Sequence, residues 1–148
     1  MNELASISAS AAIVFYVLGF AQLLIAQGRT TETLPSNRQM RVALLGMAAV
    51  ACHAWSTFSA LVTDAGIDLA LVHVCNYIAV VMVAVVALAN SRLPVISVNL
   101  LLFPIAVINC LALLIIAPGN STQLTIDSSQ ATHILLSLTA YAGLMTAA

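Results

Sequence analysis

The sequence predicts an all-α, polytopic transmembrane helical bundle of about five spans, with its N-terminus outside the cytoplasm. Hydrophobic residues make up 62% of the 148-residue chain and charged residues only 6%, whereas a soluble domain carries roughly a quarter charged residues. The apolar residues gather in five runs, each close to the roughly 20 residues needed to cross about 30 Å of hydrocarbon. The composition therefore excludes a water-soluble fold.

Each apolar run is expected to be a helix, because backbone amides in lipid must be satisfied within their own segment. None of the runs shows the ten-residue alternation of polar and apolar residues that is typical of barrel strands. The first run has neither a basic region before it nor a small-residue cleavage site, so we expect a retained span rather than a signal peptide. The chain is expected to form one transmembrane domain over residues 1–148, with spans at about 5–26, 42–62, 69–89, 95–117 and 131–148.

The charges in the connections predict the orientation of the spans. The first and third connections hold all the basic residues, whereas the second and fourth hold acidic residues and no basic ones: Arg29, Arg38, Arg41 and Arg92 against Asp64, Asp68 and Asp127. By the positive-inside rule, the first and third connections are cytoplasmic. The N-terminus and residues 118–130, the longest outer connection, then face outward. With only four basic residues the chain has no surface to neutralise phosphates, so nucleic acid is not an expected partner.

Catalytic constellations are missing from the sequence. No nucleophile with a base, carboxylate pair or phosphate loop can be assembled, since every carboxylate lies in a connection or in the N-terminal tail. We therefore expect no enzyme. Cys52, Cys75 and Cys110 stand alone in apolar runs, without a C-x-x-C pair, and are expected to be buried small hydrophobes.

His53 is the histidine expected at mid-membrane. It lies about twelve positions into the second run, roughly 18 Å along the helix axis. An ionisable side chain in hydrocarbon is costly and usually faces the bundle interior. His53 shares a helix face with small residues, which allow close helix approach: Gly46, Ala49, Thr57 and Ala60. It therefore either hydrogen-bonds across a helix contact or serves as a metal or haem-iron ligand.

The fifth run carries a line of polar residues. His133, Ser137 and Tyr141 follow one another at four-residue spacing, which places them on one side of a helix. In an apolar helix such a line must face protein or a wet cavity. Hydrogen bonding to a neighbouring helix and ligand binding both remain open interpretations.

Polar residues also occur at the start of the third run and within the fourth. His73, Asn76 and Tyr77 form a polar corner near the outer surface, where the simplest role for His73 is a hydrogen bond to a headgroup or loop. Asn99 and Asn109 are expected to make helix-to-helix hydrogen bonds of about 1 kcal/mol each.

The segment HILLSLTAYAG, with His133 followed eight residues later by Tyr141 and then by Ala142, resembles the H-x7-Y-A segment of a known family. This is the bacterial and plastid cytochrome c assembly protein family of the CcsA and HemX type. The order of the spans, the AVACHAW stretch around His53 and the segment LPVISVNLLLFPIAVINCLAL are similar to the YpjD-type inner membrane branch.

The resemblance implies a haem-binding protein of the bacterial inner (plasma) membrane that takes part in cytochrome c-type biogenesis. Members have about eight spans, and the assembly factors present haem to apocytochrome c at the outer face. His133 matches the haem-iron ligand, and His53, His73 and Tyr141 are the other cofactor-binding candidates. The expected partners are the lipid bilayer, haem, and apocytochrome c or another membrane assembly subunit. The tryptophan-rich outer loop and second outer-face histidine of the family would lie beyond Ala148, so the chain is expected to be the N-terminal part of a longer protein.

Two other functions fit the residues. A small permease-like subunit would use His53 and the proline-containing fourth run to line a substrate path. A structural membrane subunit would use its histidines for helix packing alone. A proton-coupled pump is disfavoured, because relays usually need an Asp or Glu inside the spans and none lies there.

Overall fold

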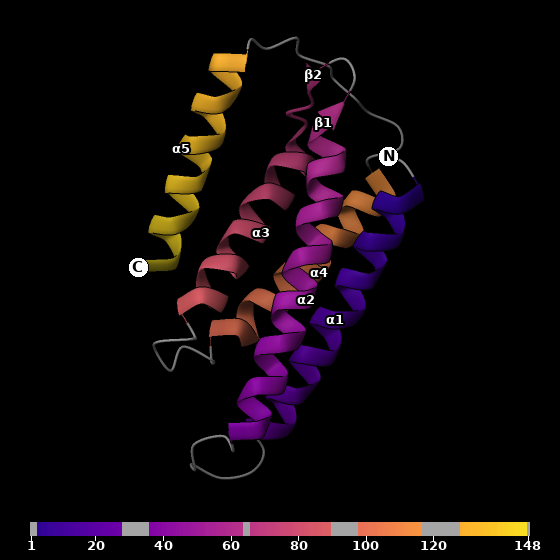
Figure 1. Ribbon diagram of the computed structural model, residues 1–148, viewed down its shortest axis with the longest axis vertical. Coiled ribbons are helices and arrows are strands. Elements are labelled where there is room, and N and C mark those ends of the chain that lie inside the picture. Colours follow the sequence, from indigo (N-terminus) through magenta and orange to yellow (C-terminus); the bar gives the residue numbers. More distant parts are fainter. Residues whose placement is uncertain (1–2, 28–35, 64–65, 90–97, 117–127, 148) are drawn as a thin grey trace.

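The computed structural model describes residues 3–27, 36–63, 66–89, 98–116 and 128–147. In these ranges the chain forms five helices and a short antiparallel hairpin (Figure 1). The elements in chain order are α1 Glu3–Gln27, α2 Ser36–Leu61, β1 Val62–Thr63, β2 Gly66–Ile67, α3 Leu71–Ala89, α4 Asn99–Ile116 and α5 Ser128–Ala147.

All five predicted runs are helical, and the predicted all-α bundle is confirmed. The boundaries differ in places, because a helix can continue past the hydrocarbon edge. Helix α2 begins six residues before its apolar run and includes the polar segment that starts at Ser36. Helix α4 begins at Asn99, and the predicted start of this run, residues 95–97, lies outside the described residues.

Four of the helices in the described ranges, α1 to α4, are long and apolar enough to cross a membrane. About a third or less of each apolar window is buried against other helices, and large hydrophobic side chains such as Leu44, Leu71 and Ile115 are exposed. An apolar exterior of this extent is suited to lipid. Helix α5 is 20 residues long but more polar, so its role as a fifth span stays a prediction.

The first four helices form a closed ring, and α5 lies outside it. Helix α1 packs against α2 and α4, and α3 packs against the same two helices, which closes the ring. Helix α5 packs mainly on α3. Successive helices alternate in direction, so α1, α3 and α5 all begin at the same end of the molecule (Figure 1). This alternation agrees with the order of inner and outer connections predicted from the charges.

The ring packs around Phe103 of α4, which is only 2% exposed. Its ring centroid lies 5.4 Å from that of Tyr16 on α1. A Cβ atom at Gly19 of α1 would stand 2.7 Å from the Phe103 ring, and one at Gly46 of α2 would stand 3.5 Å from it. Small residues therefore let both helices approach α4 closely. The predicted small-residue face of α2 is buried along its length, from Gly46 through Ala49 to Thr57 and Ala60.

A two-stranded hairpin joins α2 to α3, a feature that the apolar pattern did not predict. Val62 pairs with Ile67 and Thr63 with Gly66. Gly66 has a φ of 124°, a left-handed conformation that glycine adopts without a Cβ clash. Two residues after Gly66, Asp68 donates its backbone N–H to the Leu61 carbonyl at 2.8 Å. The hairpin thereby holds Asp68 beside the start of α3.

The three cysteines have different environments. Cys110 is buried and Cys52 is half-buried, but Cys75 is exposed on α3, so the prediction that all three are buried was wrong for Cys75. The physical reason is that an apolar thiol gains as much from lipid as from the bundle interior. An apolar sequence context therefore does not show on which side of a membrane helix a cysteine lies.

Candidate functional site

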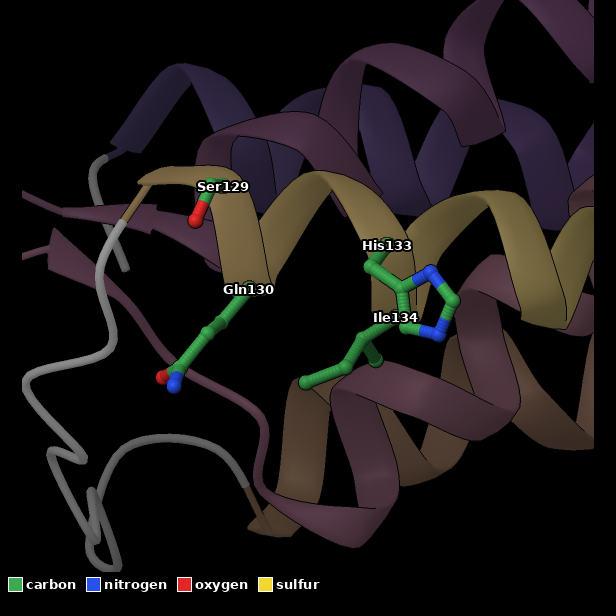
Figure 2. Close-up of a pocket in the computed structure, with 4 residues that line it drawn as sticks. All are labelled: Ser129, Gln130, His133 and Ile134. Carbon is green, nitrogen blue, oxygen red and sulfur yellow. The ribbon is translucent and has the colours of Figure 1, made fainter.

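His133 lies on the second turn of α5 and is exposed. It lines a surface hollow of about 420 Å³ together with Ser129, Gln130 and Ile134. Figure 2 shows these four side chains projecting from the first two turns of the helix. Among the described residues, the His133 imidazole has no hydrogen-bond partner in the structure. No described residue therefore occupies its nitrogens.

The predicted polar line on α5 is present, and it faces away from the ring. Ser137 and Tyr141 are exposed like His133, and Tyr141 is 68% exposed. The Ser137 hydroxyl donates to the His133 carbonyl at 2.8 Å, which satisfies it within its own helix. The face of α5 that is buried contains Ala131 and Ala142. His133 lies about 200° around the helix from Ala131, at 100° per residue, so the described residues supply no neighbouring helix for the line to pack on.

His53 has the opposite environment, because it is fully buried inside the ring. Its Nδ1 lies 3.2 Å from the Tyr16 hydroxyl of α1, and its Nε2 lies 3.0 Å from Oδ1 of Asn76 on α3. Tyr16 and His53 also meet edge to face, with ring centroids 5.8 Å apart. One imidazole thus links three helices of the ring.

The hydrogen-bond partners of His53 and Asn76 determine where the protons lie. The Asn76 Nδ2 group donates to the carbonyls of Val72 and Asn109, at 2.9 and 3.0 Å. Its Oδ1 must then face His53, and an amide oxygen can only accept. His53 Nε2 therefore carries the proton, and Nδ1 accepts the proton of the Tyr16 hydroxyl. Neutral His53 is satisfied at both nitrogens.

Helix α4 takes part in these hydrogen bonds through its backbone. We expected the Asn109 side chain to bond to another helix, but its Nδ2 donates to the Ile105 carbonyl of its own helix at 2.9 Å. The contact between helices uses the Asn109 carbonyl instead. The Asn99 side chain is buried, and its Oδ1 has no hydrogen-bond partner among the described residues. The predicted helix-to-helix bond of the Asn109 side chain was therefore wrong, because an asparagine can satisfy itself on its own preceding turn. A helix-to-helix bond of the Asn99 side chain stays a prediction.

His73 pairs with a residue from the hairpin end rather than with a headgroup. Its Nδ1 lies 3.5 Å from Oδ2 of Asp68, and the two side chains are 6% and 3% exposed. The other carboxylate oxygen of Asp68 accepts the Ala70 backbone N–H at 2.9 Å. The predicted polar corner is thus divided three ways: His73 faces Asp68, Asn76 faces His53, and Tyr77 faces Thr139 of α5 at 2.7 Å.

The three histidines do not converge on one site. An iron ligand must offer an imidazole lone pair. His53 fails this test, since one nitrogen carries a proton and the other accepts from Tyr16. His73 is buried against a carboxylate. In the described part of the chain, His133 is the one histidine that is both exposed and without a hydrogen-bond partner. In the described part of the chain, no three His, Cys, Asp or Glu side chains gather in a group that could hold a metal ion.

The sequence did not reveal the partners of the histidines. Tyr16 and Asn76 carried a weak signal, since a buried polar side chain in a span must find a partner, but nothing in their spacing joined them to His53. Comparison of the chain with protein-family models, with curated proteins and with solved structures found no match.

Proposed function

We propose that this chain binds haem in the bacterial inner membrane and takes part in cytochrome c-type biogenesis, with His133 as the residue that would hold the haem iron. The observation that supports this proposal is the exposed imidazole of His133, which has no partner in the described residues, beside a hollow on the outward side of α5. The similarity of the segment from His133 to Tyr141 to the assembly proteins supports it independently.

His133 and Tyr141 of α5 would have different roles in haem binding. His133 would supply a neutral imidazole nitrogen, and a six-coordinate iron would need a second ligand from elsewhere in the protein. Tyr141 lies about 12 Å further along the helix, on the same exposed side, where its ring can pack against an apolar ligand. Bound haem would supply the cargo for attachment to apocytochrome c, the expected partner along with another assembly subunit.

The environment of His53 supports a packing role for that residue. Its side chain is 0% exposed, so it offers no surface to a substrate path of the permease-like kind. A structural role for the whole chain would leave the exposed polar line of α5 unexplained.

The proposal is tested by the absorbance spectrum of the full-length protein, purified in detergent. We expect a Soret band that His133→Ala abolishes or shifts. His73→Ala is the matched control and should leave the band nearly intact, because His73 is buried against Asp68. A protein without Soret absorbance, or a band unchanged by His133→Ala, would contradict the haem assignment and leave packing as the role of α5.

The proposed orientation in the inner membrane has its own test. Reporter fusions after Ser36 and Arg92 should report the cytoplasm, and fusions after Gly66 and Ser121 the outer compartment. The alternating helix directions in Figure 1 support this pattern. An inverted pattern would show that the four arginines do not set the topology.

A further inference from the structure

A second cavity lies between α2, α3, α5 and the hairpin. Its volume is about 290 Å³, roughly twice that of an apolar cavity of about 150 Å³ that accommodates benzene. Ala54, Phe58 and other α2 residues form one wall, and Tyr77 of α3 and Leu135 of α5 lie across from them. The lining is almost entirely apolar, so the cavity suits an apolar ligand.

One polar residue of the lining is Thr57, whose side chain is 2% exposed and whose Oγ1 has no hydrogen-bond partner among the described residues. A buried threonine in a helix usually donates to the carbonyl four residues earlier. Here that carbonyl belongs to His53 and already accepts the Ser56 hydroxyl at 2.9 Å, besides the helical N–H of residue 57. Both of its lone pairs are in use, so the Thr57 hydroxyl is left with a proton to donate.

Water is a poor partner for this hydroxyl. A buried water needs two to four polar contacts, whereas the lining is almost entirely apolar and its other hydroxyl, that of Tyr77, already donates its proton to Thr139 at 2.7 Å. A ligand that satisfies Thr57 must therefore combine an apolar body with one acceptor oxygen.

The depth of Thr57 indicates where such a ligand originates. The apolar window of α2 runs from Gln39 to Leu61, so Thr57 stands roughly 10 Å from its centre by the helix rise. The half-thickness of the hydrocarbon is about 15 Å. Thr57 thus lies just inside the boundary on the outer side, near the level at which acyl chains join their ester groups. The neighbouring Phe58 is 60% exposed, which opens this wall toward lipid.

We propose that this cavity binds the ester end of a phospholipid acyl chain from the outer leaflet, with the Thr57 hydroxyl donating to the ester carbonyl. The apolar walls hold the first part of the chain between α2 and α5. This site is separate from His133 and does not rest on haem binding.

The test uses the full-length protein in phosphatidylcholine vesicles whose lipid carries a photoreactive diazirine near the ester. Peptide mass spectrometry measures labelling of Leu135 in the cavity relative to Ile115. Ile115 is 76% exposed near the end of α4, so it reports contact with bulk lipid. Leu135 is half-buried and therefore less accessible to bulk lipid than Ile115. We nevertheless expect it to be labelled at least as strongly as Ile115, because the cavity holds the lipid beside it.

Ala54→Phe fills the cavity from its exposed edge and should lower the labelling ratio at least fivefold. Ala51→Phe is the matched control, since Ala51 is exposed on the same helix but does not line the cavity. Thr57→Val should lower the ratio about threefold, the effect of one hydrogen bond in a membrane, and Thr57→Ser should restore it. If Ala54→Phe does not fold, Ala54→Leu fills the same edge with a smaller side chain.

Three outcomes would overturn the proposal. The first is a ratio that neither filling variant lowers, which would mean that Leu135 meets only bulk lipid. The second is equal labelling by an ether-linked lipid, which lacks the carbonyl. The third is a Thr57→Val ratio equal to that of the wild type, which would exclude the hydroxyl from binding.

Discussion

The four-helix ring and α5 place polar side chains in opposite ways. In the ring, Tyr16, His53 and Asn76 are buried and bonded to one another across helices. On α5, His133 and Tyr141 are exposed and lie away from the face that packs on the ring. A histidine that is bonded at both nitrogens fixes helix positions, whereas one with a free imidazole can bind a ligand. The comparison shows that the residue type alone does not decide which role a membrane histidine has.

The largest expected effect is on the ring and comes from Asn76→Ala. It leaves the His53 Nε2–H and the Asn109 carbonyl without their partner, at a cost of about 2 to 3 kcal/mol in the free energy of unfolding. Unfolding in mixed detergent micelles measures this loss. Asn109→Ala is the control and should cost less than about 1 kcal/mol, because its side chain bonds only within α4. Equal losses for the two variants would contradict the chain of bonds between helices.

Glycine substitutions compare packing in the two regions. Gly19→Ala pushes a Cβ to 2.7 Å from the Phe103 ring, and such overpacking should destabilise the ring by about 1 to 2 kcal/mol. Gly143→Ala meets nothing within 4 Å, so the better helix propensity of alanine should stabilise α5 by up to about 1 kcal/mol. Thermal unfolding followed by circular dichroism should show opposite signs. Destabilisation by Gly143→Ala would mean that α5 is packed on that side as well.

The attachment of α5 to the ring is tested by Tyr77→Phe. The Thr139 hydroxyl donates to the Leu135 carbonyl at 2.7 Å, so the Tyr77 hydroxyl must be the donor in its bond with Thr139. Losing this bond should cost only about 0.5 to 1 kcal/mol overall. Hydrogen exchange should accelerate in α5 and stay unchanged in α4. Faster exchange throughout the chain would show that α5 and the ring unfold together.

The smallest expected effect on stability is that of His133→Ala, within about 0.5 kcal/mol, as for other exposed positions. The free energy of unfolding is measured in the haem-free protein, alongside the absorbance test. The two measurements together separate ligand binding from packing as the role of His133. A larger loss of stability would indicate that His133 contacts part of the protein beyond the described residues and serves packing.

The spans were predictable because each depends on local chemistry. A run of apolar residues long enough for the bilayer must form a helix wherever it lies, so α1 to α4 were found to within a few residues. Helix α5 was found as well, but its polar turns around His133 leave it less apolar than the others. The hairpin at Gly66 was missed, since two residue pairs leave almost no periodicity in a sequence.

The candidate site was only partly predictable. Three histidines in or near apolar runs indicated where to look, and the small residues around His53 correctly indicated a buried helix face. Their partners could not be predicted, because Tyr16, His53 and Asn76 meet across sequence separations of 37 and 23 residues. The role of Thr57 was hidden too, since it depends on the Ser56 hydroxyl occupying a carbonyl that threonine would otherwise use.

The sequence by itself predicted a membrane-spanning chain and where its helices run, because hydrophobic length is a property of single segments. Only the tertiary structure decided which helices close the ring, which histidine is satisfied at both nitrogens and which has no partner among the described residues. The physical reason is that lipid and the bundle interior are both apolar. Hydrophobicity therefore cannot distinguish the two faces of a membrane helix, and contacts between helices assign them.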